Sequence, residues 1–208
     1  MEIWISSDLH LDHLKIIEYC NRPFADQYEM TEKLITWHNE LVKPEDHWYH
    51  LGDCTMARGS LGSTQAQRFI GLIKRMNGHK RLILGNHDHF PPKVYLEAGF
   101  EKIVGTGQWL DNMILSHYPV HPASLGRSKG CIHGHCHGQD DISPLVTETS
   151  IQPYLNVCVE RIDYRPITLG ECKERLAKIS DRVLQCVHDD KRADRCATTE
   201  GTEEVERP

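Results

Sequence analysis

The segment Arg81-Leu82-Ile83-Leu84-Gly85-Asn86-His87-Asp88 joins a short apolar run to a glycine and three polar side chains. An apolar run of this length that ends in a turn signal predicts a buried strand over residues 81–84. The same arrangement occurs twice upstream, where residues 2–6 lead into Ser7-Asp8 and residues 47–51 lead into Gly52-Asp53. Because strand ends are rigid supports for loop residues, we expect these polar side chains to converge on one site.

The rest of the pattern is that of a mixed α/β domain. Helical and strand periodicity predict five further elements: helices over 30–42 and 63–76, and strands over 112–116, 130–133 and 155–161. Strands and helices alternate in the first half of the chain, whereas strands gather in the second half. We therefore expect one domain over residues 1–168, an amphipathic helix over 169–188, and a charged, poorly packed tail over 189–208.

Length, charge and cysteine usage exclude several classes of protein. The chain has 208 residues, which fits one domain with an appendage, and its net charge of −6 argues against extended nucleic-acid binding. It contains no apolar run long enough for a membrane span, and its first residues do not resemble a signal peptide. The eight cysteines include no Cys-x-x-Cys pair, which favours reduced thiols over a structural zinc site. These observations predict a cytoplasmic protein with no membrane partner.

Histidines, carboxylates and an amide just past the predicted strands form a candidate metal site. The candidate ligands are Asp8, His10, Asp53, Asn86, His117, His135 and His137. Nitrogen and oxygen ligands without a thiolate suit manganese, iron, zinc, cobalt or nickel. Seven candidates exceed the three or four protein ligands of one catalytic zinc, but they suit two metals that share a bridging carboxylate. Such a site would keep a net positive charge and would favour an anionic phosphate.

The motifs Asp8-x-His10, Gly52-Asp53, Gly85-Asn86-His87-Asp88, His117 and Gly134-His135-x-His137 resemble, in order, those of the calcineurin-like metallophosphoesterase superfamily. The resemblance is strongest to short, single-domain bacterial and phage members. It implies a four-layered α/β/β/α sandwich of two mixed sheets and two divalent transition-metal ions, with manganese preferred. It also implies hydrolysis of a phosphate ester by a hydroxide that bridges the two metals.

The resemblance further implies a role for each motif residue. Asp8, His10 and His137 would hold the first metal, whereas Asn86, His117 and His135 would hold the second. Asp53 would bridge the two metals. His87 would give a proton to the leaving group, a role that suits an imidazole near neutral pH, and Asp88 would orient it.

The choice of ester is open at this point. Only 17 residues lie between His117 and His135, so a large capping insertion is absent, and we favour a phosphodiesterase acting on a small ester such as a nucleotide or a cyclic phosphodiester. A phosphomonoesterase for nucleotides or sugar phosphates is the alternative, and a non-catalytic binding module is a further one. Loop residues Arg22, His121 and Arg127 are candidate substrate contacts, since arginine suits a phosphate. His50 and His133 are expected in the interior rather than as ligands.

Overall fold

The computed structural model describes residues 1–139, 144–146 and 151–199, and side chains beyond residue 186 are outside the described part. Five strands form the first sheet in the order β11-β1-β2-β3-β4. They are β1 (Ile3–Ser6), β2 (His47–His50), β3 (His79–Ile83), β4 (Phe100–Val104) and β11 (Ile167–Thr168). Neighbouring strands from β1 to β4 are parallel, and β11 pairs antiparallel with β1. The first sheet is therefore mixed, as predicted.

The second sheet is also mixed and has the order β10-β7-β6-β5. Its strands are β5 (Gly107–Leu110), β6 (Met113–Ser116), β7 (Cys131–His133) and β10 (Tyr154–Asn156). The pairs β10–β7 and β7–β6 are parallel, whereas β5 and β6 are antiparallel. A separate small ribbon joins β8 (Leu145–Val146) to β9 (Ile151–Gln152). Two mixed sheets with helices confirm the predicted α/β architecture.

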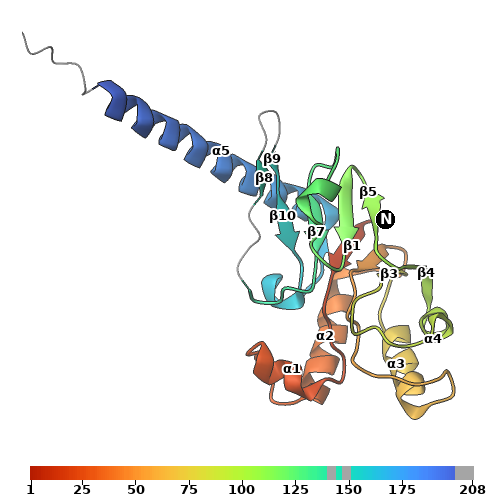
Figure 1. Ribbon diagram of the computed structural model, residues 1–208. Helices are drawn as coiled ribbons and strands as arrows, with labels where there is room; N and C mark the ends of the chain where they lie inside the picture. Colours follow the sequence, from red (N-terminus) through yellow and green to blue (C-terminus); the bar gives the residue numbers. More distant parts are fainter. Residues whose placement is uncertain (140–143, 147–150, 200–208) are drawn as a thin grey trace, which may run out of the picture.

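Four helices lie together on the outer side of the first sheet (Figure 1). They are α1 (Leu14–Tyr19), α2 (Gln27–Leu41), α3 (Thr64–Lys74) and α4 (Pro92–Glu97). Local chemistry determines where α2 and α3 begin, because the side chains of Asp26 and Ser63 accept hydrogen bonds from backbone amides of the first turn. Buried side chains of these helices form one core with residues of the sheet such as Trp48, Leu82 and Phe100.

A second core lies between the two sheets. Ile5, Leu51 and Ile83 of the first sheet region pack there with Leu115 and Ile132 of the second. The helix α5 (Leu169–Thr199) closes this core at one side through its first turns, where Leu169, Cys172 and Leu176 are buried. The outer face of the second sheet is covered more thinly, by the loop that carries the 3-10 helix η1 (Pro122–Ser124) and the buried Leu125.

Two predicted boundaries need correction. The strand predicted over 155–161 ends at Asn156, and Val159–Arg161 form the 3-10 helix η2. The apolar alternation continues past Asn156 because the chain passes from one sheet to the other, so that Val157 is buried between the sheets and Val159 is buried under the helices. The helix predicted over 169–188 begins at Leu169 but extends to Thr199, well away from the sheets (Figure 1), and residues 200–208 lie outside the described residues.

Sequence periodicity missed seven short elements, namely α1, α4, β4, β5, β8, β9 and β11. α1 and α4 are shorter than two helical turns, β8, β9 and β11 have two residues each, and polar residues interrupt the apolar ones in β4 and β5, so none of these elements carries a clear period. In the part of the chain that the structure describes, no helix is both long enough and apolar enough to cross a bilayer.

Candidate dimetal site

The candidate ligands lie at one edge of the two sheets because parallel strands end there together. In the first sheet, Ser6 at the end of β1 is in register with His50 of β2, which in turn pairs with Leu82 of β3. In the second sheet, Ser116 of β6 pairs with His133 of β7. The next few residues along each strand are the motif residues, so parallel register brings five separate sequence segments to one place.

The first ligand group contains Asp8, His10 and His137, whose ligand atoms all lie within 4.8 Å of one another. The Oδ1 atom of Asp8 is 3.4 Å from Nε2 of His137 and 3.9 Å from Nε2 of His10. Its Oδ2 atom is already used, because it accepts hydrogen bonds from the backbone amide of His135 and the thiol of Cys158. Asp8 therefore offers Oδ1 to this group.

The second ligand group contains Asp53, His117 and His135. Nε2 of His117 is 3.5 Å from Oδ2 of Asp53 and 2.9 Å from Oδ1 of Asn86. The same Asp53 oxygen is 3.7 Å from Nε2 of His10, which belongs to the first group. Oδ2 of Asp53 thus lies between the two groups.

Orphaned polar atoms indicate that these residues fit metal ions. Oδ1 of Asp8 and both ring nitrogens of His10 are buried and have no hydrogen-bond partner among the described residues. Buried polar atoms without partners are costly, so a ligand that satisfies them is expected. Burial, with the positive charge of Arg22 nearby, also holds the pKa of His10 well below its usual value. His10 is therefore neutral, which is the form of imidazole that binds metals.

The backbone of the ligand loops is strained in a consistent way. Asp8, His10, Asp53, His135 and His137 all have φ between 45° and 68°. The left-handed region costs a residue with a side chain roughly 1–2 kcal/mol, and such residues tend to cluster at functional sites. The five ligand residues in this conformation therefore support a functional site here.

A glycine lets two of these ligand loops approach each other. A Cβ atom on Gly134 would overlap Oγ of Ser7 and Oδ2 of Asp8. The residue before His135 must therefore be glycine for the second sheet to bring its histidines against Asp8.

Comparison with known proteins agrees with this geometry. A family model described as calcineurin-like phosphoesterase matches residues 1–166. The chain belongs to this family. An uncharacterised protein from Methanocaldococcus jannaschii is 32% identical over 189 residues, which are 90% of this chain and 97% of that protein. The Gene 66 protein of Mycobacterium phage D29 is 31% identical in an alignment of 166 residues that covers 66% of this chain and 79% of the phage protein.

A solved structure supports the fold of this family member. A protein of unknown function from Aquifex aeolicus superimposes with a TM-score of 0.62 at 24% sequence identity. The match covers 83% of this chain and 98% of the Aquifex chain.

Behind the ligands of this calcineurin-like phosphoesterase lies a buried ion pair that sequence analysis missed. Oε1 of Glu160 accepts a hydrogen bond from Nδ1 of His137 at 3.0 Å and is 2.7 Å from the guanidinium of Arg22. Although burial alone would raise the pKa of Glu160, His137 and Arg22 lower it to about 2. By holding Nδ1, the carboxylate turns Nε2 of His137 toward Asp8. The carbonyl of Leu51 orients His117 in the same way, 2.8 Å from its Nδ1.

Arg22 differs from its predicted role as a substrate contact. Its side chain has no exposed area, and its guanidinium donates hydrogen bonds to the backbone carbonyls of Asp8 and Leu9 as well as to Glu160. The long chain of arginine reaches inward because the Asp8 loop and Glu160 both offer oxygen acceptors. Arg22 therefore supports the first ligand group from behind.

Asp88 also differs from its predicted role as the residue that orients His87. Its carboxylate accepts hydrogen bonds from the backbone amides of Asp53, Cys54 and Gly85, at 2.8–3.0 Å. Burial raises the pKa of Asp88 to about 6 even though these amides favour its charged form. Asp88 thus clamps the loops after β2 and β3 to each other.

His87 lies beside the ligands, with its ring centroid 5.6 Å from that of His10, and its backbone amide donates to Oδ1 of Asp53. His121 and Arg127 are the other two predicted substrate contacts. Both are exposed, and Nδ1 of His121 caps η1 by accepting from the amide of Ala123. His50 is fully buried, as predicted, and burial lowers its pKa to about 3.

Proposed function

We propose that this chain is a dimetal phosphoesterase that hydrolyses a small phosphate ester, with phosphodiesters favoured. The observation that carries the proposal is the position of Asp53 between two ligand groups. Asp8, His10 and His137 would hold one metal, and Asn86, His117 and His135 would hold the other. Two bound divalent ions, with manganese preferred, would supply a hydroxide nucleophile and polarise the phosphoryl group.

The residues of the chain contribute position and a proton. Asp88 accepts a hydrogen bond from the backbone amide of Asp53, and the backbone amide of His87 donates to the Asp53 side chain. Held in this way, Asp53 would keep the two ions at a constant separation. The His87 ring would give its proton to the departing oxygen, because it is partly exposed beside His10 and is free of either ligand group. Arg22 and Glu160 would preserve the geometry of the first ion during turnover.

Preference for a diester follows from an open site. The loop between His117 and His135 packs against the outer face of the second sheet, where its Leu125 is buried with Ile114 and Tyr154. The part of the loop around Leu125 is therefore held on the outer face of the second sheet, whereas Tyr118 at its start lies beside His135, with ring centroids 4.5 Å apart. A loop of this length, without a large insertion, would leave room for a second substituent on the phosphate. The seven described cysteines are free, which agrees with a reducing cytoplasm as the proposed location.

The test compares an aryl phosphodiester with the matching monoester, using full-length protein stripped of metal and refilled with manganese. We expect faster hydrolysis of the diester. A monoester preference would overturn the diester proposal, and protein that binds no metal would overturn the dimetal proposal.

Two variants separate ligand from acid. His87→Ala should keep both metals and lose about 10²–10⁴-fold in turnover, whereas Asp53→Ala should lose metal as well as activity. His79→Ala is the matched control, because His79 is an exposed histidine at the opposite end of β3. Loss of metal by His87→Ala would show that the assignment of the acid is wrong.

A further inference from the structure

A cavity of about 340 Å³ opens beside the first ligand group, between the beginnings of α2 and α3. Its volume is at the lower end of the range for small-ligand pockets. The ring centroid of His13, which lines the cavity, is 5.6 Å from that of His10. Thr55 joins the two ligand loops at the cavity floor by donating to the carbonyl of Leu11. The side chain of His13 is therefore all that separates a ligand in this cavity from His10 of the candidate metal site.

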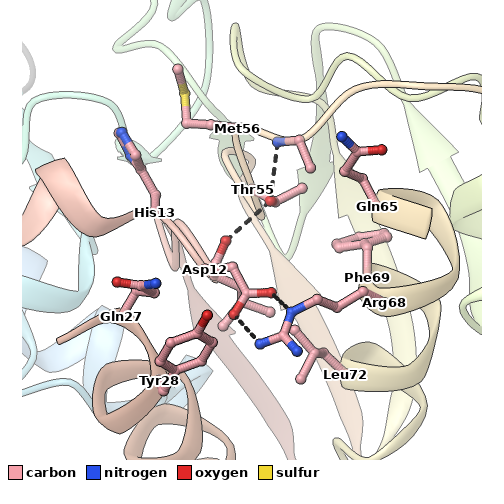
Figure 2. A pocket seen from close by; sticks show the side chains of 12 residues that line it. Asp12, His13, Gln27, Tyr28, Thr55, Met56, Gln65, Arg68, Phe69 and Leu72 are labelled. Atoms are coloured by element: carbon pink, nitrogen blue, oxygen red, sulfur yellow. Dashed lines mark hydrogen bonds and ion pairs between the residues drawn. The ribbon is translucent and has the colours of Figure 1, made fainter. Parts of the chain in front are cut away.

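One wall of the cavity is a flat, exposed aromatic ring. Tyr28 on α2 is 58% exposed although it is a large aromatic residue, and Figure 2 shows it facing the cavity. The guanidinium of Arg68 on α3 lies over this ring, 5.5 Å from its centroid. Asp12 holds Arg68 in place by a two-pronged ion pair. The aromatic ring and the guanidinium plane are both surfaces on which a planar heterocycle can stack.

Side-chain amides supply the polar groups of the cavity. Gln27 stands beside Tyr28 on α2, and Gln65 stands on the opposite wall on α3 (Figure 2). Each amide offers both a donor and an acceptor, which matches the mixed edge of a nucleobase. The deeper lining is apolar and includes Phe69 and Leu72, which suits the faces of a ring. Charge is balanced inside the cavity because Asp12 pairs with Arg68.

We propose that this cavity binds the nucleobase of a nucleotide unit whose phosphate lies at the dimetal site. The base stacks on the face of Tyr28 that Arg68 leaves uncovered, and its edge faces the amides of Gln27 and Gln65. This inference rests on the proposed function for the position of the phosphate. It deepens that function by making the substrate nucleotidic.

The first test measures binding by titration calorimetry on manganese-loaded, full-length protein. The probes are adenosine 5′-monophosphate and ribose 5-phosphate, which share a phosphate but differ in the base. We expect the nucleotide to bind roughly tenfold more tightly or better, and Tyr28→Ala to remove most of that advantage. Tyr19→Ala is the matched control, because Tyr19 is an exposed tyrosine of α1 that does not line the cavity. Equal affinities in the wild type, or an advantage that survives Tyr28→Ala, would overturn the inference.

A second measurement separates this inference from the proposed function. Adenosine, which has no phosphate, is titrated into metal-stripped wild type, Tyr28→Ala and Tyr19→Ala. Binding that only Tyr28→Ala loses supports the cavity assignment even if the protein hydrolyses no ester. Ester hydrolysis without adenosine binding supports the phosphoesterase and overturns the base pocket.

An adenosine dinucleotide and adenosine 5′-monophosphate are compared as competitors of bound adenosine. This comparison decides whether the base belongs to the end of a strand or to a free nucleotide. Tighter competition by the dinucleotide than by the mononucleotide assigns the base to the end of a strand, whereas equal or weaker competition assigns it to a free nucleotide. In either case Tyr28→Ala should weaken the competition, and competition that Tyr28→Ala leaves unchanged would overturn the base pocket.

Discussion

Glu160→Gln tests the buried support of the first ligand group. The side chain of Glu160 is 8% exposed and that of Arg22 has no exposed area, so the substitution leaves the Arg22 charge without its partner. The pKa of Glu160, which His137 and Arg22 lower to about 2 against the effect of burial, corresponds to roughly 3 kcal/mol of favourable interaction. Removing one partner of a buried ion pair costs a similar amount, about 3–5 kcal/mol. We therefore expect metal-free Glu160→Gln to lose about 3 kcal/mol in the free energy of unfolding.

The same substitution should weaken one of the two metal positions. Loss of a carboxylate behind a metal-binding histidine typically lowers affinity by about 10–100-fold, or roughly 1.4–2.8 kcal/mol. Among the proposed ligands, the contacts described for Glu160 are with His137 alone. We therefore expect manganese affinity to fall at the position that His137 would hold and to persist at the other position.

Urea unfolding of metal-free protein and calorimetric titration with manganese measure these two effects. Glu40→Gln is the matched control, because Glu40 pairs with Arg165 at the surface and both side chains are at least 40% exposed. An exposed pair contributes little, so this variant should resemble the wild type in both assays. The reasoning is refuted if Glu160→Gln unfolds at the wild-type urea midpoint and binds manganese with unchanged affinities.

Three further outcomes are expected. Gly134→Ala should lower manganese affinity at least tenfold, because the added Cβ overlaps Asp8. Gly138→Ala is the control, because nothing lies within 4 Å of a Cβ at that position. Equal calorimetric titrations of the two variants with manganese would contradict this prediction. Burial lowers the pKa of His38 to about 4, so the unfolded chain binds a proton that the folded chain does not, and stability falls as pH drops from 6.5 toward 4. His38→Gln should therefore reduce the slope of unfolding free energy against pH by about 1.4 kcal/mol per unit in that window, and an unchanged slope in urea melts would exclude this account. Chelation should lower the melting temperature, and added manganese should restore it. Both shifts should be larger at pH 7 than at pH 5, because metal ions compete with protons for the ligands. A melting temperature that neither treatment changes would argue against bound metal.

The predicted strands before Asp8, Asp53 and Asn86 are present, and their carboxyl ends meet as expected. This part of the fold was predictable because each strand is an apolar run bounded by a turn residue, which is a local signal. Convergence was expected because strand ends are rigid supports for loop residues, and the parallel register of β1, β2 and β3 brings it about. Short elements such as β11 were missed because two residues carry no period.

The contact between Arg22 and Glu160 is one that local sequence patterns cannot predict. The two residues are 138 positions apart, and only folding buries them as a pair behind His137. An arginine in a loop and a glutamate after a short strand carry no signal of that partnership, and the loop position of Arg22 by itself predicts a substrate contact. The family resemblance predicts that Asp88 orients His87, but the carboxylate of Asp88 accepts hydrogen bonds from the backbone amides of Asp53 and Cys54 in another loop.

The sequence by itself determined the candidate ligands, the motif glycines and the mixed α/β class, because these depend on residue type and on spacing along the chain. Only the tertiary structure decided which oxygen of Asp8 remains available, which residues support the ligands from behind, and that α2 and α3 enclose a cavity beside the site. The physical reason is that burial and pairing depend on groups far apart in sequence, and their energies exist only after the two sheets and the helices have packed together.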